Sequence, residues 1–179
     1  HAKINIKIPH KGGGWDWHQD YGYWYNNGCL FPDMLTVYVI INDTNINNGC
    51  LKILEGSHKL GRIDLERINE QNTINKNILN ILYKKFKLIN CEGCPGDIII
   101  FHSNIVHGSS ENTSNNERIG LLGAYNTKHN DPIFNHQYPN FYKIKKLNKN
   151  EIFNKNNNER RIYVSKRDST SNYINSNLK

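Results

Sequence analysis

Short runs of alternating or continuous apolar residues occupy the first two thirds of the chain and predict β-strands. Residues 2–8 alternate, with Ile4, Ile6 and Ile8 on one face and polar side chains on the other. Residues 34–41 form a longer run of residues that favour strands, and residues 97–102 contain three consecutive isoleucines. We expect further short strands over residues 50–54, 86–90, 105–110 and 118–125.

One stretch departs from this pattern. Between residues 64 and 85 the apolar positions recur at intervals closer to those of a helix, with an Asn-rich interruption. Strands and helices do not alternate along the chain, and neither a GxGxxG fingerprint nor a phosphate-binding loop is present. The pattern therefore predicts an all-β protein with a minor helix, arranged as a sandwich, jelly roll or barrel.

The whole excess of positive charge lies in the last third of the chain. The net charge is +7, but residues 1–126 hold 12 basic and 12 acidic residues, whereas residues 127–179 hold 11 basic and 4 acidic ones. The last third is also rich in Asn and Lys and lacks the interleaved aromatic residues of a nucleic-acid stacking surface. We therefore predict a folded core over residues 1–132 and a basic, partly disordered tail over residues 133–179, and we disfavour nucleic acid as a partner.

The size and the cysteine content agree with one intracellular domain. A chain of 179 residues suits a single core, and its longest apolar run, of about seven residues, is far too short to span a membrane. Cys91 and Cys94 form a lone CxxC without a second pair for zinc, and we interpret them as small buried residues around a turn. We expect a cytoplasmic protein, with targeting left open because the chain begins at His1 and not at Met.

One histidine lies in a setting that suggests metal binding. His18 and Asp20 are two positions apart, so on an extended segment both side chains point to the same face. A third ligand has to come from elsewhere, and His107, after an apolar strand, is the best candidate. Two histidines and one carboxylate on one face suit the Fe(II) of non-haem oxygenases, which keeps open positions for a co-substrate and dioxygen. His102 could replace His107, and Asp16 could replace Asp20.

Arg118 adds a possible anion contact to this set. It lies 11 residues after His107 at the start of a predicted strand, and Glu117 is the only acidic residue near it in sequence. An arginine that lines a barrel needs an anionic partner, because an unpaired buried charge is costly. A dicarboxylate co-substrate would supply that partner in bidentate geometry.

These residues lie within a series of motifs that resembles the phytanoyl-CoA dioxygenase family of Fe(II)/2-oxoglutarate-dependent oxygenases. The resemblance covers about residues 1–132. The matching segments, in the family's order, are Trp17-His18-Gln19-Asp20-Tyr21, Ile41-Asn42-Asp43-Thr44, Asn48-Gly49-Cys50-Leu51-Lys52, Glu55-Gly56-Ser57-His58-Lys59, Gly96-Asp97-Ile98-Ile99-Ile100-Phe101-His102-Ser103, Val106-His107-Gly108-Ser109 and Arg118.

The resemblance implies a double-stranded β-helix, which is a cupin-like jelly roll, here truncated on the N-terminal side. It implies a dioxygenase that uses Fe(II), 2-oxoglutarate and dioxygen to hydroxylate a C–H bond of a small organic substrate, releasing succinate and carbon dioxide. Since relatives that halogenate lack the carboxylate ligand, the presence of Asp20 favours hydroxylation. The residues that it assigns are His18, Asp20 and His107 to iron, Arg118, Ser109 and Asn5 to 2-oxoglutarate, and Trp24 to the substrate pocket.

Three other functions compete with this one. The main alternative is a non-catalytic or inactive cupin-like β-barrel that only binds a ligand. A nucleic-acid demethylase of the same chemistry is disfavoured. The pattern typical of such enzymes has a second arginine six positions after the one that corresponds to Arg118, and this chain has Ala124 there. A structural zinc protein is disfavoured by the carboxylate ligand and the lone CxxC.

Overall fold

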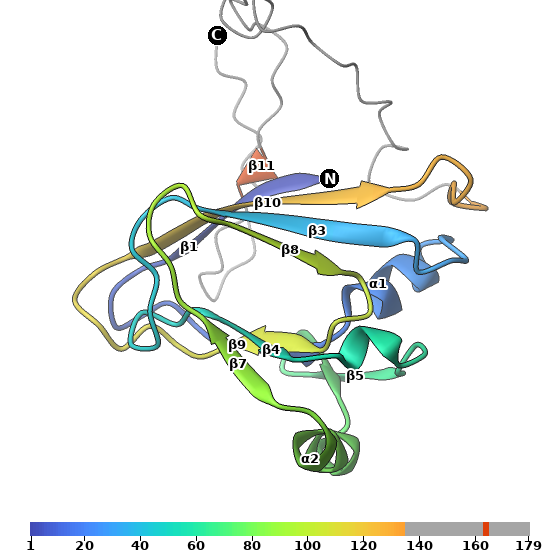
Figure 1. Cartoon of the computed structure of the whole chain (residues 1–179), viewed down its shortest axis with the longest axis horizontal. Coiled ribbons are helices and arrows are strands. Elements are labelled where there is room, and N and C mark those ends of the chain that lie inside the picture. The colour runs from blue at the N-terminus through green and yellow to red at the C-terminus, as the bar shows by residue number, and fades with distance from the viewer. Residues whose placement is uncertain (135–162, 165–179) are drawn as a thin grey trace, which may run out of the picture.

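A computed structural model describes residues 1–134 and 163–164 of the chain. Two sheets make up most of it, with a small hairpin and two short helices (Figure 1). Their strands are antiparallel, except that the edge strand β11 pairs parallel to β1. The strands are β1 (Ala2–Lys7), β2 (Trp15–His18), β3 (Met34–Ile40), β4 (Leu51–Leu54), β5 (Leu65–Ile68), β6 (Gln71–Ile74), β7 (Leu88–Cys91), β8 (Ile98–His102), β9 (His107–Ser109), β10 (Arg118–Asn126) and β11 (Tyr163–Val164). The helices are α1 (Asp20–Asn26), α2 (Lys76–Lys85) and a 3-10 turn (Ser57–Lys59).

The two sheets face one another as the layers of a jelly roll (Figure 1). The five-stranded sheet has the order β11-β1-β10-β3-β8, and the four-stranded sheet has the order β2-β9-β4-β7. Helix α2 lies beyond the four-stranded sheet, on the side away from the other layer (Figure 1). The predicted all-β fold with a minor helix is confirmed.

Two clusters of apolar side chains form the core. One core cluster joins the layers through Tyr38, Ile40, Leu51, Phe101 and Ile105. A second cluster, Leu54, Ile74, Leu82 and Val106, packs the four-stranded sheet against α2 and the β5–β6 hairpin. The burial of these side chains supplies most of the driving force for folding.

Strand β1 presents its polar face to the interior. Its inward residues are Lys3, Asn5 and Lys7, and Lys7 is only 2% exposed. The isoleucines at the alternate positions lie on the outer face of the five-stranded sheet, where Ile6 is exposed. The alternating pattern therefore predicted the position of this strand correctly. The face that points to the interior is the polar one, however, and the isoleucine face points outward.

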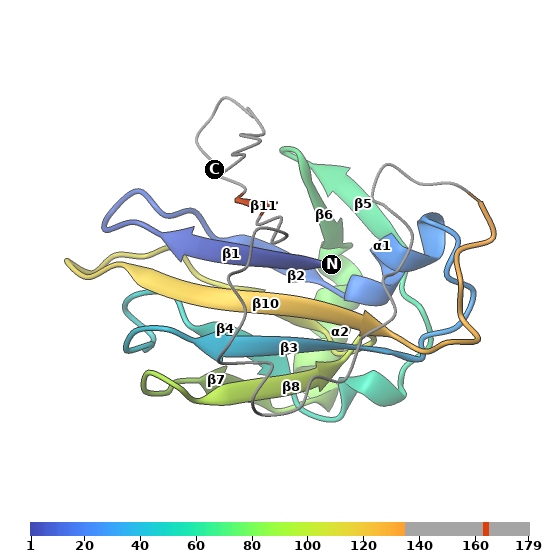
Figure 2. The same cartoon turned by 90° about the horizontal axis from the view of Figure 1, so that it is seen from above.

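Apolar residues also continue across the outer face of this sheet. The pairing registers bring Ile4, Leu121, Val39 and Ile98 into one row across four strands. Ile98 is 58% exposed and its neighbour Ile100 is 64% exposed. Neither helix of residues 1–134 covers this face (Figure 2). None of the helices in these residues is long and apolar enough to cross a membrane.

Three local expectations need correction or refinement. The aromatic segment after Trp17, for which no element was predicted, forms α1. The segment 64–85 is not one interrupted helix, because its first half forms the β5–β6 hairpin and only Lys76–Lys85 is helical. The interpretation of the CxxC as two buried residues is wrong, since Cys91 is partly buried and Cys94 is exposed. The predicted tail lies almost wholly outside the described residues.

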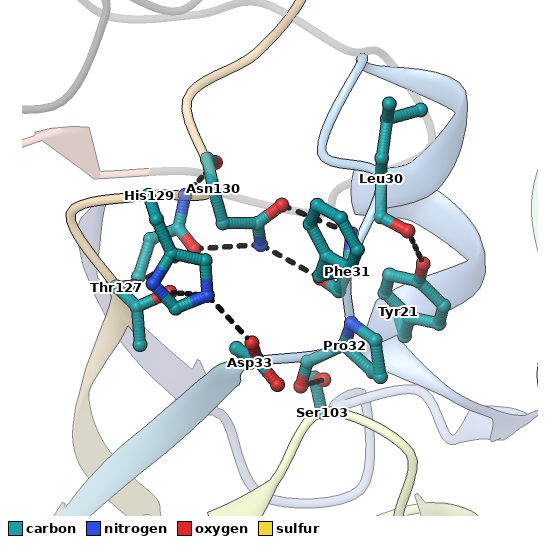
Figure 3. A network of polar contacts seen from close by, with 10 residues as sticks. Tyr21, Leu30, Phe31, Pro32, Asp33, Ser103, Thr127, His129 and Asn130 are labelled. Carbon is teal, nitrogen blue, oxygen red and sulfur yellow. Dashed lines mark hydrogen bonds and ion pairs between the residues drawn. The ribbon is translucent and has the colours of Figure 1, made fainter.

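A polar network fastens the segment after α1 to the end of β10 (Figure 3). The buried Asn130 side chain accepts a hydrogen bond from the backbone N–H of Phe31 and donates one to the carbonyl of the same residue. The Tyr21 hydroxyl donates to the carbonyl of Leu30, and His129 contacts Asp33 at 2.8 Å. These contacts hold α1 and the segment after it against the residues that follow β10.

Candidate active site

Two histidines from neighbouring strands form the centre of the site. His18 ends β2 and His107 begins β9, and the two residues are direct partners in the antiparallel register. Their ring centroids are 4.3 Å apart. The backbone pairing itself therefore brings together two residues that are 89 positions apart in the sequence.

The backbone also orients both rings. His18 Nδ1 lies 2.6 Å from the carbonyl oxygen of Asp16, and His107 Nδ1 lies 2.9 Å from that of Ile105. In this arrangement each Nδ1–H donates to a carbonyl, and each Nε2 keeps its lone pair for another partner. Such hydrogen bonds behind a histidine fix the tautomer that binds a metal.

Asp20 completes the group from the first turn of α1. Its Oδ1 lies 3.7 Å from His18 Nε2 and 3.6 Å from His107 Nε2. Its other oxygen, Oδ2, accepts a hydrogen bond of 2.7 Å from the hydroxyl of Thr36. Asp20 and His18 reach the same point across the junction between β2 and α1, and not along one extended strand as predicted.

The side chain between them anchors this junction. Gln19 is 0% exposed and points away from the histidines, as the alternation predicts. Its amide donates to the carbonyls of Gly61 and Asn104, and its carbonyl oxygen accepts from the backbone N–H of Ile63. These three bonds fix the point where the strand becomes a helix.

The electrostatics keep the group ready for a cation. Burial alone would raise the pKa of Asp20, but the neighbouring histidines and the Thr36 hydroxyl outweigh it and hold the pKa well below its ordinary range. Burial, and then the charge of His18, lower the pKa of His107 to about 4. At neutral pH the site therefore holds a carboxylate and a neutral His107 imidazole, the forms that ligate metals.

These three residues form the one group of possible metal ligands within the described part of the chain. Their ligand atoms all lie within 4.8 Å of one another, which suits a single ion. The alternatives that the sequence left open are not in this group: Asp16 is exposed, and the ring of His102 lies 6.2 Å from that of His58. Two nitrogens and one carboxylate oxygen fit Fe(II) with open positions.

A cavity beside the histidines carries the predicted arginine. The cavity has a volume of about 520 Å³, including its opening to solvent, and its wall includes Asn5, Arg118 and Ser109. Arg118 is buried and donates to the carbonyl of Gly49 at 3.0 Å and to the side-chain oxygen of Asn5. The structure thus brings together the three residues that the resemblance assigns to 2-oxoglutarate.

Two buried polar atoms on this wall have no hydrogen-bond partner among the described residues. They are Nε of Arg118 and the hydroxyl of Tyr38, and both residues line the cavity. Unpaired buried polar groups cost free energy and commonly mark the place of a ligand. A dicarboxylate that accepts hydrogen bonds here would satisfy them, so the residues fit 2-oxoglutarate.

The sequence reasoning missed two residues of the wall and placed one residue differently. Tyr38 and Lys3 are the missed ones, and they line the cavity together with Trp15, whose ring lies 5.0 Å from the Lys3 amine. Residues 34–41 are apolar on both faces of the strand, so the sequence gives no signal that Tyr38 faces inward. Trp24 is not part of this wall, because its ring packs 6.0 Å from the ring of His1.

Comparison with known proteins gives one consistent family. Residues 1–120 match the phytanoyl-CoA dioxygenase (PhyH) family. L-proline trans-4-hydroxylase from Streptomyces griseoviridis is 30% identical over 146 residues, which cover 73% of this chain and 54% of that protein. 2-Aminoethylphosphonate dioxygenase from uncultured bacterium HF130_AEPn_1 is 31% identical over 124 residues, covering 69% of this chain and 44% of that protein.

Solved structures agree with this fold. EctD from S. alaskensis, determined with 2-oxoglutarate and 5-hydroxyectoine, superimposes with a TM-score of 0.64 at 24% identity, covering 73% of this chain and 44% of that chain. The likeness confirms the predicted jelly roll. The chain spans about half the length of the curated relatives that it matches.

Proposed function

The chain belongs to the phytanoyl-CoA dioxygenase family, and from this we propose that it acts as an Fe(II)- and 2-oxoglutarate-dependent dioxygenase. In the proposed reaction dioxygen and 2-oxoglutarate are consumed with a substrate C–H group. The products are succinate, carbon dioxide and the corresponding alcohol, so that one oxygen atom enters succinate and the other enters the substrate.

The observation that carries this proposal is the convergence of His18, Asp20 and His107. The two Nε2 atoms and Asp20 Oδ1 face one point, while hydrogen bonds to Asp16, Ile105 and Thr36 hold the opposite sides of the three side chains. These residues would hold Fe(II), which supplies the oxidising chemistry once 2-oxoglutarate and dioxygen are bound. The protein's part is to fix the ligand geometry and exclude water.

Arg118, Ser109 and Asn5 are the proposed contacts of the co-substrate. The Arg118 guanidinium offers its unpartnered Nε–H to the distal carboxylate, and Asn5 holds its Nη2 in place. The Ser109 hydroxyl offers a further donor from the same wall. Tyr38 joins this set through its unpartnered hydroxyl.

For the substrate we infer a small molecule that carries both a nitrogen and an acidic group. The relatives are named for proline hydroxylation, for 2-aminoethylphosphonate and for ectoine, and each of these compounds has both groups. Lys3 on the cavity wall offers a positive charge for the acid. Trp24, on α1, remains a proposed contact of the substrate, outside the cavity wall.

The test measures iron-dependent release of succinate from 2-oxoglutarate, with and without L-proline, ectoine and 2-aminoethylphosphonate. Wild type is expected to release succinate, and His107→Ala to abolish the release and to lower the bound iron from one equivalent to near zero. His10→Ala is the matched control, because His10 is exposed, contacts Asn115 and is not part of the cavity wall. Unchanged succinate release by His107→Ala would contradict the ligand assignment. Iron binding without any release would favour a binding protein.

A further inference from the structure

A lysine that the proposed function does not use is buried behind the co-substrate wall. Lys7, at the end of β1, is 2% exposed. Its amine donates a hydrogen bond of 2.8 Å to the hydroxyl of Ser109 and a second one to the carbonyl of Ser110. Lysine is almost never fully buried without a compensating partner, so this position calls for an explanation.

The amine has no acidic partner close by. Among residues 1–134, no carboxylate lies within 4.0 Å of it, and none of the ion pairs includes it. Its direct partner in the β1–β10 register is Arg118, a second buried cation. When Lys7 is protonated, two buried cations stand side by side on this wall without an acid, and an anion in the cavity would stabilise that charged form.

The backbone makes room for the ammonium group. Gly49 has a φ of +77°, and a Cβ at this position would lie 2.5 Å from the carbonyl oxygen of Ser110 and 3.1 Å from Lys7 Nζ. The carbonyl of the same glycine accepts the hydrogen bond from Arg118. A residue with a side chain would therefore disturb both cations, so the Asn48-Gly49-Cys50 turn acts as a cradle for them.

The Ser109 hydroxyl connects Lys7 to the cavity. A hydroxyl has one hydrogen to donate and two lone pairs to accept. When Ser109 accepts from Lys7, its own hydrogen points away from the amine, and Ser109 lines the cavity beside Arg118. Donation from a buried amine also polarises the hydroxyl and strengthens the bond that it gives in turn.

We propose that Lys7 is a positioning residue for the distal carboxylate of the co-substrate, acting through Ser109, so that a lysine–serine relay and Arg118 hold the same carboxylate. The proposal rests on the proposed use of 2-oxoglutarate. It adds a residue that does not line the cavity and that neither the ligand motif nor the arginine motif includes.

The test compares two ligands that differ only at the distal end. 2-Oxoglutarate and 2-oxobutyrate share the oxo-acid group that faces the metal, but 2-oxobutyrate lacks the distal carboxylate. Their binding to the Mn(II)-loaded protein, in which turnover does not occur, is measured by calorimetry. Lys7→Met is expected to weaken 2-oxoglutarate about 10- to 100-fold, as for the loss of one charge-assisted hydrogen bond, and to leave 2-oxobutyrate unchanged.

Four further variants separate a relay from a general structural effect. Lys84→Met is the matched control, because Lys84 is an exposed lysine of α2 that lies outside the cavity wall and is not among the charged groups around Lys7, and it is expected to bind both ligands as wild type. Ser109→Ala is expected to weaken 2-oxoglutarate selectively, and Ser109→Thr, which keeps the hydroxyl, to retain binding. In the Ser109→Ala background, Lys7→Met is expected to have less effect than alone, and a full additive loss would overturn the relay.

A wild-type measurement covers the case in which Lys7→Met does not fold. Arg118, Cys50, Lys52 and Glu111 are the charged and titratable groups around the amine, and burial with the charge of Arg118 lowers its pKa to about 7. At pH 8 the arriving carboxylate is expected to draw a proton onto Lys7, seen as extra proton uptake for 2-oxoglutarate over 2-oxobutyrate in buffers of different ionisation enthalpy. Equal uptake would overturn the proposal. Failure of both ligands to bind would instead contradict the proposed function.

Discussion

At the scale of single residues, the most unusual group is the buried amine of Lys7. Burial, and next the charge of Arg118, lower its pKa from 10.5 to about 7. At a pH between these two pKa values, Lys7 is protonated in the unfolded chain and neutral in the folded protein. The free energy of unfolding therefore rises as the pH increases from about 7 to about 10, because the folded state no longer has to bury a charge.

This sign gives a prediction for the metal-free protein. Lys7→Met is expected to be more stable than wild type at pH 7 and to lose part of the increase in stability between pH 7 and 9, at most about 1.4 kcal/mol per pH unit. Urea unfolding at several pH values measures both effects. Lys84→Met, at an exposed lysine of α2 that is not among the charged groups around Lys7, should keep the wild-type slope. An unchanged slope in Lys7→Met would show that this amine does not titrate in that range.

The residues of the candidate site divide into those that the sequence could identify and those that it could not. The three candidate metal ligands could be identified from the sequence, because the spacing of His18 and Asp20, the setting of His107 and the order of the motifs are distinctive. Lys7 was missed because in an alternating strand the apolar face is normally expected to lie inward. The close approach of Lys7 to Arg118 depends on the β1–β10 register, which the sequence does not specify.

At the scale of elements, the junction between β2 and α1 decides whether the metal ligands meet. Seven residues of α1, mostly aromatic, have weak helix propensity, and the N-cap residue Gln19 makes no capping bond with its side chain. The helix is instead held by tertiary contacts: the three bonds of Gln19 at its start and the Asn130 network after its end (Figure 3). Because these contacts come from residues distant in the sequence, the local sequence pattern could not predict α1.

Gln19→Leu tests whether the junction between β2 and α1 contributes both to stability and to metal binding. It leaves three backbone groups without their partner, which should lower the free energy of unfolding by about 2–4 kcal/mol. Because the junction sets the distance between His18 and Asp20, Mn(II) affinity should fall by at least about tenfold. Gln71→Leu is the matched control, since Gln71 bonds the backbone of Asp16 and Gly14 from the edge hairpin. Full Mn(II) affinity in a destabilised Gln19→Leu would show that the junction is not what positions the ligands.

At the scale of the whole molecule, the five-stranded sheet has an apolar outer face as well as a mixed inner one. The run of three isoleucines in β8 reads as a fully buried strand, yet only Ile99 packs on the core, and Ile98 and Ile100 lie outside. The number of strands and the absence of βαβ units were enough to predict the class of fold. Which sheet face is covered depends on packing between distant elements, and no local pattern encodes it.

Neighbouring isoleucines of β8 offer a direct test of this arrangement. Ile98→Lys is expected to change the free energy of unfolding by less than about 0.5 kcal/mol and to reduce the binding of an apolar fluorescent dye. Ile99→Lys places a charge between the sheets and should cost about 3 kcal/mol or more. Chemical unfolding measures both, and equal losses would mean that the outer face is covered in solution.

The pairing of His18 with His107 across β2 and β9 has a consequence for the rate of metal uptake. Because the backbone pairing of β2 with β9 sets the spacing of the two imidazole rings, their arrangement does not depend on a bound ion. Entry then requires small rotations of side chains and the shedding of the ion's own hydration water. Uptake should follow the known order of water-exchange speeds among divalent ions, as it does for a rigid chelator, without a slow step of chain rearrangement.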